Sequence, residues 1–200
     1  MALALLAGQM GIPFIPNRTH LGSDIEKYNE NIRRLECPFT GETLGAVKAV
    51  NPDVGILHVQ IADSQGNAQK WGSLGIDVMG INACDRVIVT TERIVEPEVI
   101  RRDPNRTMVP GIRVNAVVEE PWGSYPMHLA GCYRGDVRAF FDEIEGKGEE
   151  GLERYMKEFV YGVKNRKEFL EKVNQVKGQD YLKRLMVDPL VSSEPIHTGV

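Results

Sequence analysis

Long apolar runs separated by turn residues are the strongest pattern along the chain. The run Val54–Ile61 (VGILHVQI) is apolar on both faces, and Arg86–Val95 (RVIVTTERIV) and Val114–Val118 (VNAVV) follow it. A strand without apolar–polar alternation is typical of a parallel sheet covered on both faces. Between the first two runs, Ser73–Cys84 has helical spacing, with Ser73 as the expected N-cap. Strand, helix and strand in close succession predict an α/β fold with an open, mostly parallel sheet and flanking helices.

Shorter segments complete the N-terminal part. Residues 1–10 predict the end of an apolar helix closed by Gly11, and no residue caps its first N–H groups. This start has two interpretations: a frayed terminus, or a chain that begins within a larger domain. Ile12–Pro16 is expected to be a short strand whose prolines mark either a sheet edge or a strand end. Val47–Val50 is expected to be a short strand and Glu98–Arg102 a short helical turn.

The pattern changes at about Val137. Beyond it, apolar residues recur at steps of three and four, as they do on amphipathic helices. We therefore expect residues 1–136 to form the α/β domain and residues 137–200 to form a helical C-terminal segment, with a loose tail over 192–200. The apolar residues with this spacing are Phe140, Ile144, Leu152, Tyr155, Met156, Phe159, Val160, Val163, Phe169, Leu170, Val173 and Val176.

The composition narrows the class of protein. A length of 200 residues suits one domain, and 42% hydrophobic residues suit a soluble core. Lys and Arg number 24 against 28 Asp and Glu, and a net charge of −4 argues against a nucleic-acid or anionic-membrane partner. The three cysteines are isolated and odd in number, which argues against a disulfide framework and predicts a reducing cytoplasm. The four histidines show no HxH or HxxxH spacing, so no structural zinc site is expected. The apolar start lacks the basic residues of a signal peptide, and no stretch is long enough to span a membrane.

Loops at the carboxyl ends of the strands are candidate sites, because open α/β sheets bind their ligands there. Residues 63–68 form one such loop. Gly66 and Asn67 suit a turn with positive φ, whose N–H groups face an anion or a carbonyl oxygen. The alternative is a plain turn in which Asp63 makes local hydrogen bonds. Turn chemistry alone leaves both interpretations open.

A second candidate loop follows the third strand. Glu119 and Glu120 are adjacent, so their side chains point to opposite faces and at most one enters a given cleft. Gly123 lies a few residues further along the same loop. The alternative is that both acids are solvated charges at a strand end.

A third candidate loop covers residues 17–23. Arg18 is able to hold a carboxylate or phosphate through two parallel hydrogen bonds, and Thr19 and Ser23 add donors next to Gly22. The alternative is a surface loop with an ordinary arginine.

Other reactive side chains have structural explanations. His58 lies within a buried strand and is expected to be a core histidine with satisfied hydrogen bonds. Cys84 lies on the apolar side of the predicted helix and is expected in the core. The sequence has no nucleophile elbow, GxGxxG or P-loop. These residue patterns therefore predict an α/β domain with ligand loops at its strand ends.

Several segments match a known family in order along nearly the whole chain. Ile12–Ile25 (IPFIPNRTHLGSDI) resembles the P-F-x-P-x-R-x-x-L-G-S/T-D segment of family I coenzyme A transferase A subunits. Pro52–Gly72 resembles their PDVAIIHVQ-AD-x-x-GNAQ-x-WG segment, and ACDRVIVTTERIV (Ala83–Val95) follows. Val109–Tyr133 resembles P-x-I-x-V-D-A-V-V-E-x-P-x-G-A-H-P, and Glu158–Lys172 is similar to the helical C-terminus of the glutaconate-type A subunit.

The resemblance implies the A-type subunit of a heteromeric enzyme that moves coenzyme A between an acyl-CoA and a carboxylic acid. The nucleophile that attacks the acyl-CoA is a glutamate of the B-type subunit, so no catalytic residue is expected in this chain. The A-type chain supplies cleft walls and oxyanion donors. Coenzyme A is then a substrate, with no tightly bound cofactor, and the B-type subunit is the partner. The residues expected at substrate or coenzyme A are Arg18, Thr19, Gly22, Ser23, Gly66, Asn67, Glu120 and Gly123.

Two features depart from the family pattern. The A-type chains of the family carry an N-terminal portion ahead of the point that matches the start of this chain, and the family's Gly-Ala-His-Pro is here Gly123-Ser124-Tyr125-Pro126. Two alternatives to the transferase therefore stay open. One is a subunit of a CoA-thioester hydrolase that opens a cyclic ketone. The other is a non-catalytic, truncated subunit.

Overall fold

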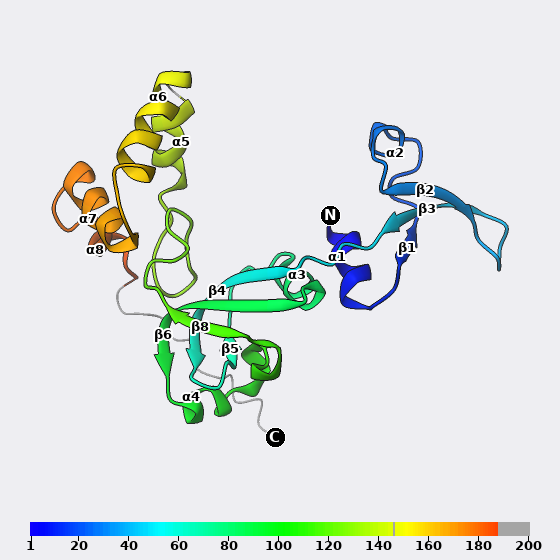
Figure 1. Ribbon diagram of the computed structural model, residues 1–200, viewed down its shortest axis with the longest axis horizontal. Helices are drawn as coiled ribbons and strands as arrows, with labels where there is room; N and C mark the ends of the chain where they lie inside the picture. The colour runs from blue at the N-terminus through cyan, green and yellow to red at the C-terminus, as the bar shows by residue number, and fades with distance from the viewer. Residues whose placement is uncertain (146, 188–200) are drawn as a thin grey trace. The chain divides into compact units, whose positions relative to one another are not determined.

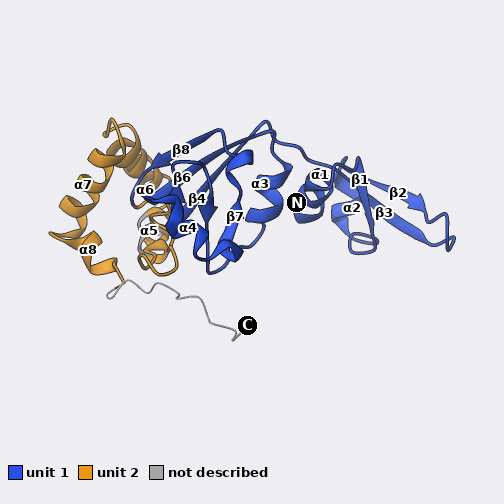
Figure 2. Ribbon diagram, turned by 90° about the horizontal axis from the view of Figure 1, so that it is seen from below, with its two compact units in different colours: residues 1–121 blue, residues 122–200 orange. Residues whose placement is uncertain are grey.

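A computed structural model describes residues 1–145 and 147–187. They divide into two compact units, Met1–Pro121 and Trp122–Val200 (Figure 2). Helices begin at Val137 as expected, but the units divide after residue 121 rather than after residue 136. The reason is that the loop ahead of the helices packs on them: Tyr125 belongs to the same buried cluster as Phe159. The predicted tail, residues 192–200, lies outside the described residues.

The larger sheet of the first unit contains the three strands that the apolar runs predict (Figure 1). β4 (Val54–Asp63), β6 (Arg86–Val95) and β8 (Ala116–Glu119) are parallel to one another. β5 (Ala68–Gln69) and β7 (Thr107–Val109) add antiparallel pairs, giving the order β7-β5-β4-β6-β8. The α/β fold class is confirmed, with a mixed sheet in which the long strands are the parallel ones.

Along the first half of β4, the core of this sheet lies on one face. Leu57 is in register with Val89, and both are buried. Val54 and Ile56, by contrast, are 47% and 69% exposed. The expectation that this strand is covered on both faces is therefore wrong for its first half, because these two side chains point away from the helix that covers the other face. The buried residues of the core are Leu57, Val59, Ala62, Ala68, Ile81, Val87, Val89 and Val109.

The covering helix, α3 (Asp77–Ala83), approaches β4 at Gly55. A Cβ on Gly55 would lie 2.7 Å from Cys84 Sγ and 2.8 Å from Ile81 Cδ1, so only glycine permits this packing. Cys84 is buried, as expected of a core cysteine, and burial raises the pKa of its thiol.

The start of α3 differs from the expectation. The N-cap position is Ile76, not Ser73, and the helix begins at Asp77. Gly75 has φ +55°, a left-handed conformation that a continuous helix from Ser73 does not allow. The turn expected near residue 98 is confirmed as α4 (Pro97–Arg101), with proline in its first turn.

A second, three-stranded antiparallel sheet has the order β1-β3-β2. The strand predicted over Ile12–Pro16 is β1 (Phe14–Asn17). The short strand predicted over Val47–Val50 overlaps β3 (Thr43–Lys48) only at Val47 and Lys48, so its bounds were wrong. Two further elements, β2 (Ile32–Glu36) and α2 (Asp24–Tyr28), were not predicted. The sequence of β2, IRRLE, has two adjacent arginines and no apolar–polar alternation, so its period gives no strand signal.

The predicted N-terminal helix is α1 (Ala2–Gln9), which contacts both the three-stranded sheet and the helix α3 beside the larger sheet. Its Ala4 joins Ile32 and Val47 in a small core under the second sheet, and the helix also contacts α3. Two single-turn 3₁₀ helices complete the unit: η1 (Pro104–Arg106) and η2 (Gly111–Arg113).

The second unit is helical. It comprises α5 (Val137–Glu145), α6 (Gly148–Tyr155), η3 (Met156–Val160), α7 (Arg166–Lys177) and α8 (Tyr181–Leu185). No helix in residues 1–145 or 147–187 is long and apolar enough to cross a membrane. Within these same ranges, no group of three or more His, Cys, Asp and Glu side chains is placed to hold a metal ion.

Candidate functional site

Two of the three predicted loops lie at one edge of the larger sheet. β4 ends at Asp63 and β8 ends at Glu119, and both strands are parallel to β6 between them. The loop 63–68 and the acids after β8 therefore follow strand ends that point the same way. The loop 17–23 follows β1 in the second sheet, and Gly123 belongs to the second unit.

The loop after β4 is organised around the buried carboxylate of Asp63. Its Oδ1 accepts hydrogen bonds from the backbone N–H groups of Gln65 and Asn67, both at 2.9 Å, and its Oδ2 accepts one from Asn67 Nδ2 at 2.9 Å. Gly66 N–H donates to the carbonyl of Asp63 at 3.1 Å. The anion that these backbone donors bind is thus the chain's own aspartate, which corresponds to the plain-turn alternative.

The same loop packs on the segment that leads to β8. Asn67 Oδ1 accepts a hydrogen bond from Gly111 N–H at 2.9 Å. A Cβ on Gly66 would lie 3.1 Å from Val114 Cβ and 3.2 Å from Gly111 Cα, and Gly66 has φ +92°. Gly66 and Asn67 therefore shape this sheet edge, and a direct contact of either residue with substrate stays a prediction.

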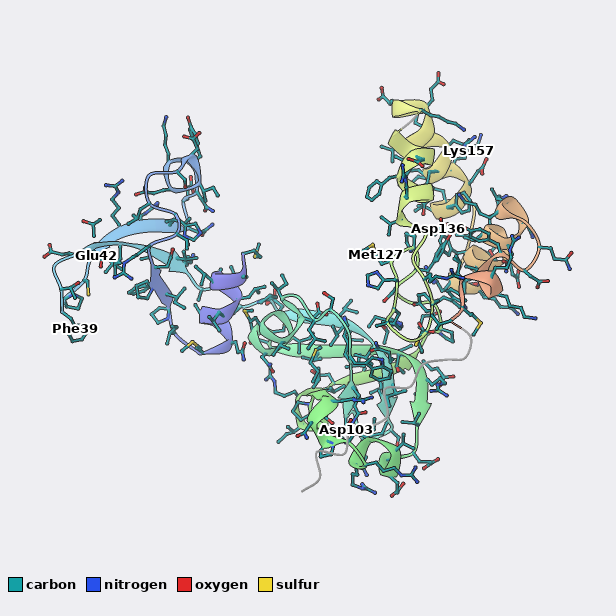
Figure 3. The ribbon with its side chains drawn as sticks, turned by 180° about the vertical axis from the view of Figure 1, so that it is seen from behind. Phe39, Glu42, Asp103, Met127, Asp136 and Lys157 are labelled. Carbon is teal, nitrogen blue, oxygen red and sulfur yellow. The ribbon has the colours of Figure 1, made fainter. Side chains whose placement is uncertain are left out.

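Arg18 forms an ion pair with a residue of the second sheet's hairpin. Its Nε and Nη2 donate to the two carboxylate oxygens of Glu42, each at 2.6 Å. The Arg18 hydrogen bond holds the pKa of Glu42 below its ordinary value, and Glu42 raises the pKa of Arg18. Both side chains are exposed, and Glu42 lies near the hairpin end (Figure 3). This pairing geometry suits a substrate carboxylate equally well, and an exposed pair exchanges readily with water and ions.

The other predicted residues of this loop bond within it. Asn17 Oδ1 accepts hydrogen bonds from Thr19 N–H at 3.0 Å and from Thr19 Oγ1 at 2.8 Å. Gly22 N–H donates to Glu26 Oε2, and Ser23 Oγ donates to the carbonyl of His20. These bonds give the backbone around Arg18 a defined shape.

The two acids after β8 diverge, as expected for adjacent strand residues. Glu119 Oε2 accepts the N–H of Ile94 at 2.7 Å, so its carboxylate is used by the sheet. Glu120 donates its own N–H to Thr91 and is half-buried. Of these two carboxylates, only that of Glu119 accepts a hydrogen bond from a strand of the sheet.

His58 is a core histidine whose ring is fully bonded, as predicted. Its Nδ1 lies 2.9 Å from Thr90 Oγ1, and its Nε2 lies 2.8 Å from Glu92 Oε1. With both ring nitrogens engaged, His58 does not present a basic nitrogen to a ligand. The partnership with Glu92 was not expected, although both residues lie within predicted strands.

In the second unit, Gly123 and Ser124 lie between two anchored aromatic residues. The Trp122 ring stacks on that of Tyr133, with centroids 4.3 Å apart, and the Tyr125 hydroxyl donates to Asp136 Oδ2 at 3.0 Å. Tyr125 is 8% exposed, and burial together with Asp136 raises the pKa of its phenol. At the position of the family's histidine, this chain therefore has a buried, neutral tyrosine.

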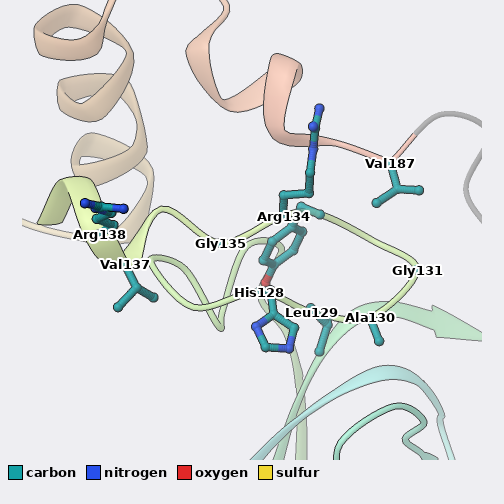
Figure 4. A pocket seen from close by; sticks show the side chains of 10 residues that line it. His128, Leu129, Ala130, Gly131, Arg134, Gly135, Val137, Arg138 and Val187 are labelled. Carbon is teal, nitrogen blue, oxygen red and sulfur yellow. The ribbon is translucent and has the colours of Figure 1, made fainter.

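A hollow of about 530 Å³ also lies in the second unit (Figure 4). Three basic side chains border it, those of His128, Arg134 and Arg138, and Arg134 Nη2 also donates to the carbonyl of Arg184 at 3.2 Å. None of the predicted site residues lines it. The sequence carried no signal for it, because its lining comes from an irregular loop without a motif.

The comparisons with known proteins agree on one family. Residues 1–120 match the family model described as Coenzyme A transferase. The chain is 37% identical over 179 residues to the A-type chain of 3-oxoadipate CoA-transferase from Pseudomonas knackmussii, and the match covers 88% of this chain and 62% of that relative. It is 32% identical over 185 residues to the A-type chain of glutaconate CoA-transferase from Acidaminococcus fermentans, covering 84% of this chain and 58% of the relative.

The fold gives the same answer. The crystal structure of glutaconate coenzyme A-transferase from Acidaminococcus fermentans matches with a TM-score of 0.81 at 30% identity, over 94% of this chain and 63% of that one. A more distant relative is the cholesterol ring-cleaving hydrolase IpdA subunit of Rhodococcus jostii, 31% identical over 145 residues, which are 68% of this chain and 49% of the relative. The chain thus spans about three fifths of the length of its transferase relatives.

Proposed function

Because the chain belongs to the coenzyme A transferase family, we propose that it acts as the A-type subunit of a heteromeric CoA-transferase. The observation that carries this proposal is the continuous similarity to the A-type chain of 3-oxoadipate CoA-transferase over 88% of the chain. The enzyme moves coenzyme A from an acyl-CoA to a carboxylic acid, and coenzyme A is a substrate. The complex acts in the cytoplasm, in keeping with Cys37, Cys84 and Cys132, which form no disulfide within the described residues.

The chemistry proceeds through the partner's glutamate. Its carboxylate attacks the thioester carbonyl, which forms a mixed anhydride and releases the coenzyme A thiolate. The thiolate then attacks the glutamyl carbonyl, so that a glutamyl thioester forms and the first acid leaves as a carboxylate. The acceptor carboxylate repeats these two steps in reverse. Neither half of the cycle consumes water.

This chain supplies binding and shape rather than the nucleophile. Arg18 exchanges Glu42 for the carboxylate of the acid substrate through the same two donors. Thr19, Gly22 and Ser23 fix the backbone around Arg18. Gly66 and Asn67 shape the loop after β4, and contacts of Gly66, Asn67, Glu120 and Gly123 with substrate or coenzyme A remain predictions.

Two experiments on the complex with its B-type partner test this proposal. The first measures transfer from an acyl-CoA to an acceptor acid, which should require both subunits. The second treats the acyl-CoA-loaded complex with borohydride, which reduces a glutamyl thioester to an alcohol. The mass change should appear on the partner and not on this chain. Transfer by this chain alone, or a modified residue on it, would contradict the proposal.

A second candidate function rests on the similarity to the ring-cleaving hydrolase subunit. A ring-cleaving hydrolase opens the ring of its substrate with water and no other co-substrate, whereas the transferase needs an acceptor acid. Turnover in the absence of any acceptor would therefore favour the hydrolase. If the intact complex has neither activity, the remaining interpretation is that this chain is a non-catalytic, truncated subunit.

A further inference from the structure

The loop that carries Gly123 and Ser124 starts in a strained conformation. Trp122 has φ +66°, in the left-handed region that glycine favours and that other residues rarely adopt. Such a conformation persists only where the surroundings fix it, and it is frequent at ligand-binding loops. Something in the second unit must therefore hold the backbone of Trp122.

Part of the restraint comes from the neighbouring segment. Tyr133 stacks its ring on Trp122, and its hydroxyl accepts the N–H of Ser124 at 3.0 Å. Asp136 holds Tyr125 through the phenol. These contacts fix two side chains and one amide. The Trp122 carbonyl also accepts the N–H of Tyr125 at 3.0 Å, which closes a turn around Gly123 and Ser124.

Arg166 adds hydrogen bonds to the carbonyls at both ends of this turn. It is the first residue of α7, and its Nη2 donates to the carbonyl oxygen of Trp122 and, at 3.3 Å, to that of Tyr125. The two carbonyls flank Gly123 and Ser124 on either side. The guanidinium also lies 4.7 Å from the centroid of the Phe169 ring, which restricts its orientation. Both carbonyls are bonded by one nitrogen, Nη2, whose orientation the planar guanidinium fixes, whereas a lysine ammonium sits on a flexible stem.

We propose that Arg166 is a positioning residue that holds Gly123 and Ser124 in the shape required at the substrate, an inference that rests on the proposed function. The flanking residues are large and anchored, whereas these two are small and Gly123 is exposed. Their backbone is therefore open to close approach by a ligand. Without Arg166, Trp122 relaxes toward negative φ and displaces both residues.

The test compares three variants in the complex with the B-type partner: Arg166→Gln, Arg166→Lys and Lys167→Gln. Lys167 is the matched control, because it is the next residue of α7, is exposed, and loses the same charge. We expect Arg166→Gln to lower kcat about tenfold to a hundredfold with little change in KM, since a small displacement at a reaction centre has effects of that order. Arg166→Lys should recover part of kcat, and Lys167→Gln should match the unmodified complex.

A spectroscopic measurement separates positioning from general stability. The chain has two tryptophans, so a Trp71→Phe background leaves Trp122 as the sole reporter. Arg166→Gln in that background should shift the Trp122 emission and raise its quenching by acrylamide, and Lys167→Gln should do neither. An unchanged kcat and emission, with only a lower melting temperature, would overturn the proposal. If the unmodified complex transfers no coenzyme A, the proposed function fails, and an unshifted Trp122 emission would then overturn the restraint by Arg166 as well.

Discussion

At the scale of single residues, the side chains expected to bind ligand already bind groups of the chain itself. The Asp63 carboxylate accepts hydrogen bonds from backbone N–H groups of the loop that contains Gly66. The Glu42 carboxylate accepts hydrogen bonds from the guanidinium of Arg18. The two cases differ in burial. Asp63 is 1% exposed and its network is part of the fold, whereas the Arg18–Glu42 pair is open to solvent. Only the second pair offers a ready exchange with a substrate carboxylate.

If substrate replaces Glu42 at Arg18, substitutions of Arg18 and of Glu42 should change KM in opposite directions. Arg18→Gln should raise KM for the acid substrate about tenfold, a typical value for a lost charge-assisted hydrogen bond. Glu42→Gln removes the competing carboxylate and should lower KM. Steady-state kinetics of the complex, with kcat nearly constant in both variants, measures this. If KM rises in both, the ion pair has a structural role and Arg18 is an ordinary surface residue.

Substitution of Gly66 should reduce stability in addition to any effect on activity. Gly66→Ala places a Cβ 3.1 Å from Val114 Cβ at φ +92°, and we expect destabilisation of about 1–3 kcal/mol. Gly75→Ala is the matched control, because Gly75 also has positive φ but a Cβ there meets nothing within 4 Å. Urea unfolding of both variants should show the larger effect at Gly66. Equal effects would show that the backbone conformation alone matters, not the packing on Val114.

At the scale of elements, the sequence was informative where the hydrophobic period is strong. The runs that became β4, β6 and β8 were predicted because each segment contains consecutive apolar residues rich in valine and isoleucine. β2 was missed because Arg33 and Arg34 interrupt any alternation, and its pairing with β3 is set by tertiary contacts such as Ile32 opposite Val47. The start of α3 was misplaced because the glycine that delays it gives the same signal in a loop and in a helix.

For the candidate site too, local sequence patterns were informative and tertiary contacts were not. The positions of the loops were predictable, since they depend on where the strands end. Their hydrogen-bond partners were not, because Asn67 bonds Gly111 and Arg166 bonds Trp122 across more than forty residues of sequence. No local pattern encodes contacts of that separation.

Two tyrosines of the second unit, Tyr125 and Tyr181, lead us to expect a loss of stability at alkaline pH. Burial and Asp136 raise the pKa of Tyr125, and the same causes raise that of Tyr181 to about 12. Because the folded state favours the neutral phenols, this contribution is complete below the ordinary pKa of 10 and is lost as the pH rises through the folded values. Urea unfolding below and above pH 10 should show the decrease. Tyr125→Phe should reduce it and cost about 1 kcal/mol at neutral pH.

The control for this prediction is Tyr161→Phe, since Tyr161 is 78% exposed. That variant should keep the full pH dependence. If Tyr125→Phe keeps it too, the alkaline loss does not arise from the buried phenol.

At the scale of the whole molecule, one face of the larger sheet is apolar and open. Ile56 is in register with Ile88 of β6, and Val118 of β8 lies on the same face beside Thr90. Ile56 and Val118 are 69% and 44% exposed, and no strand within the described residues pairs with the outer edge of β8. Exposed apolar surface and unpaired strand edges both favour association.

The chain purified without a partner should therefore self-associate, and Ile56→Thr should reduce this. Light scattering over a range of concentrations gives the solution mass, and we expect Ile56→Thr to lower it while changing the free energy of unfolding by no more than about 0.5 kcal/mol, as is usual for surface sites. Leu57→Thr is the matched control, because the adjacent side chain is 6% exposed and points into the core. It should cost about 2–5 kcal/mol, the range for truncating a buried leucine, and should not reduce association. A chain that stays monomeric at every concentration would show that this face does not drive contacts between molecules. The same mass for Ile56→Thr and the unmodified chain would place the contact elsewhere, with the open edge of β8 as the next surface to substitute.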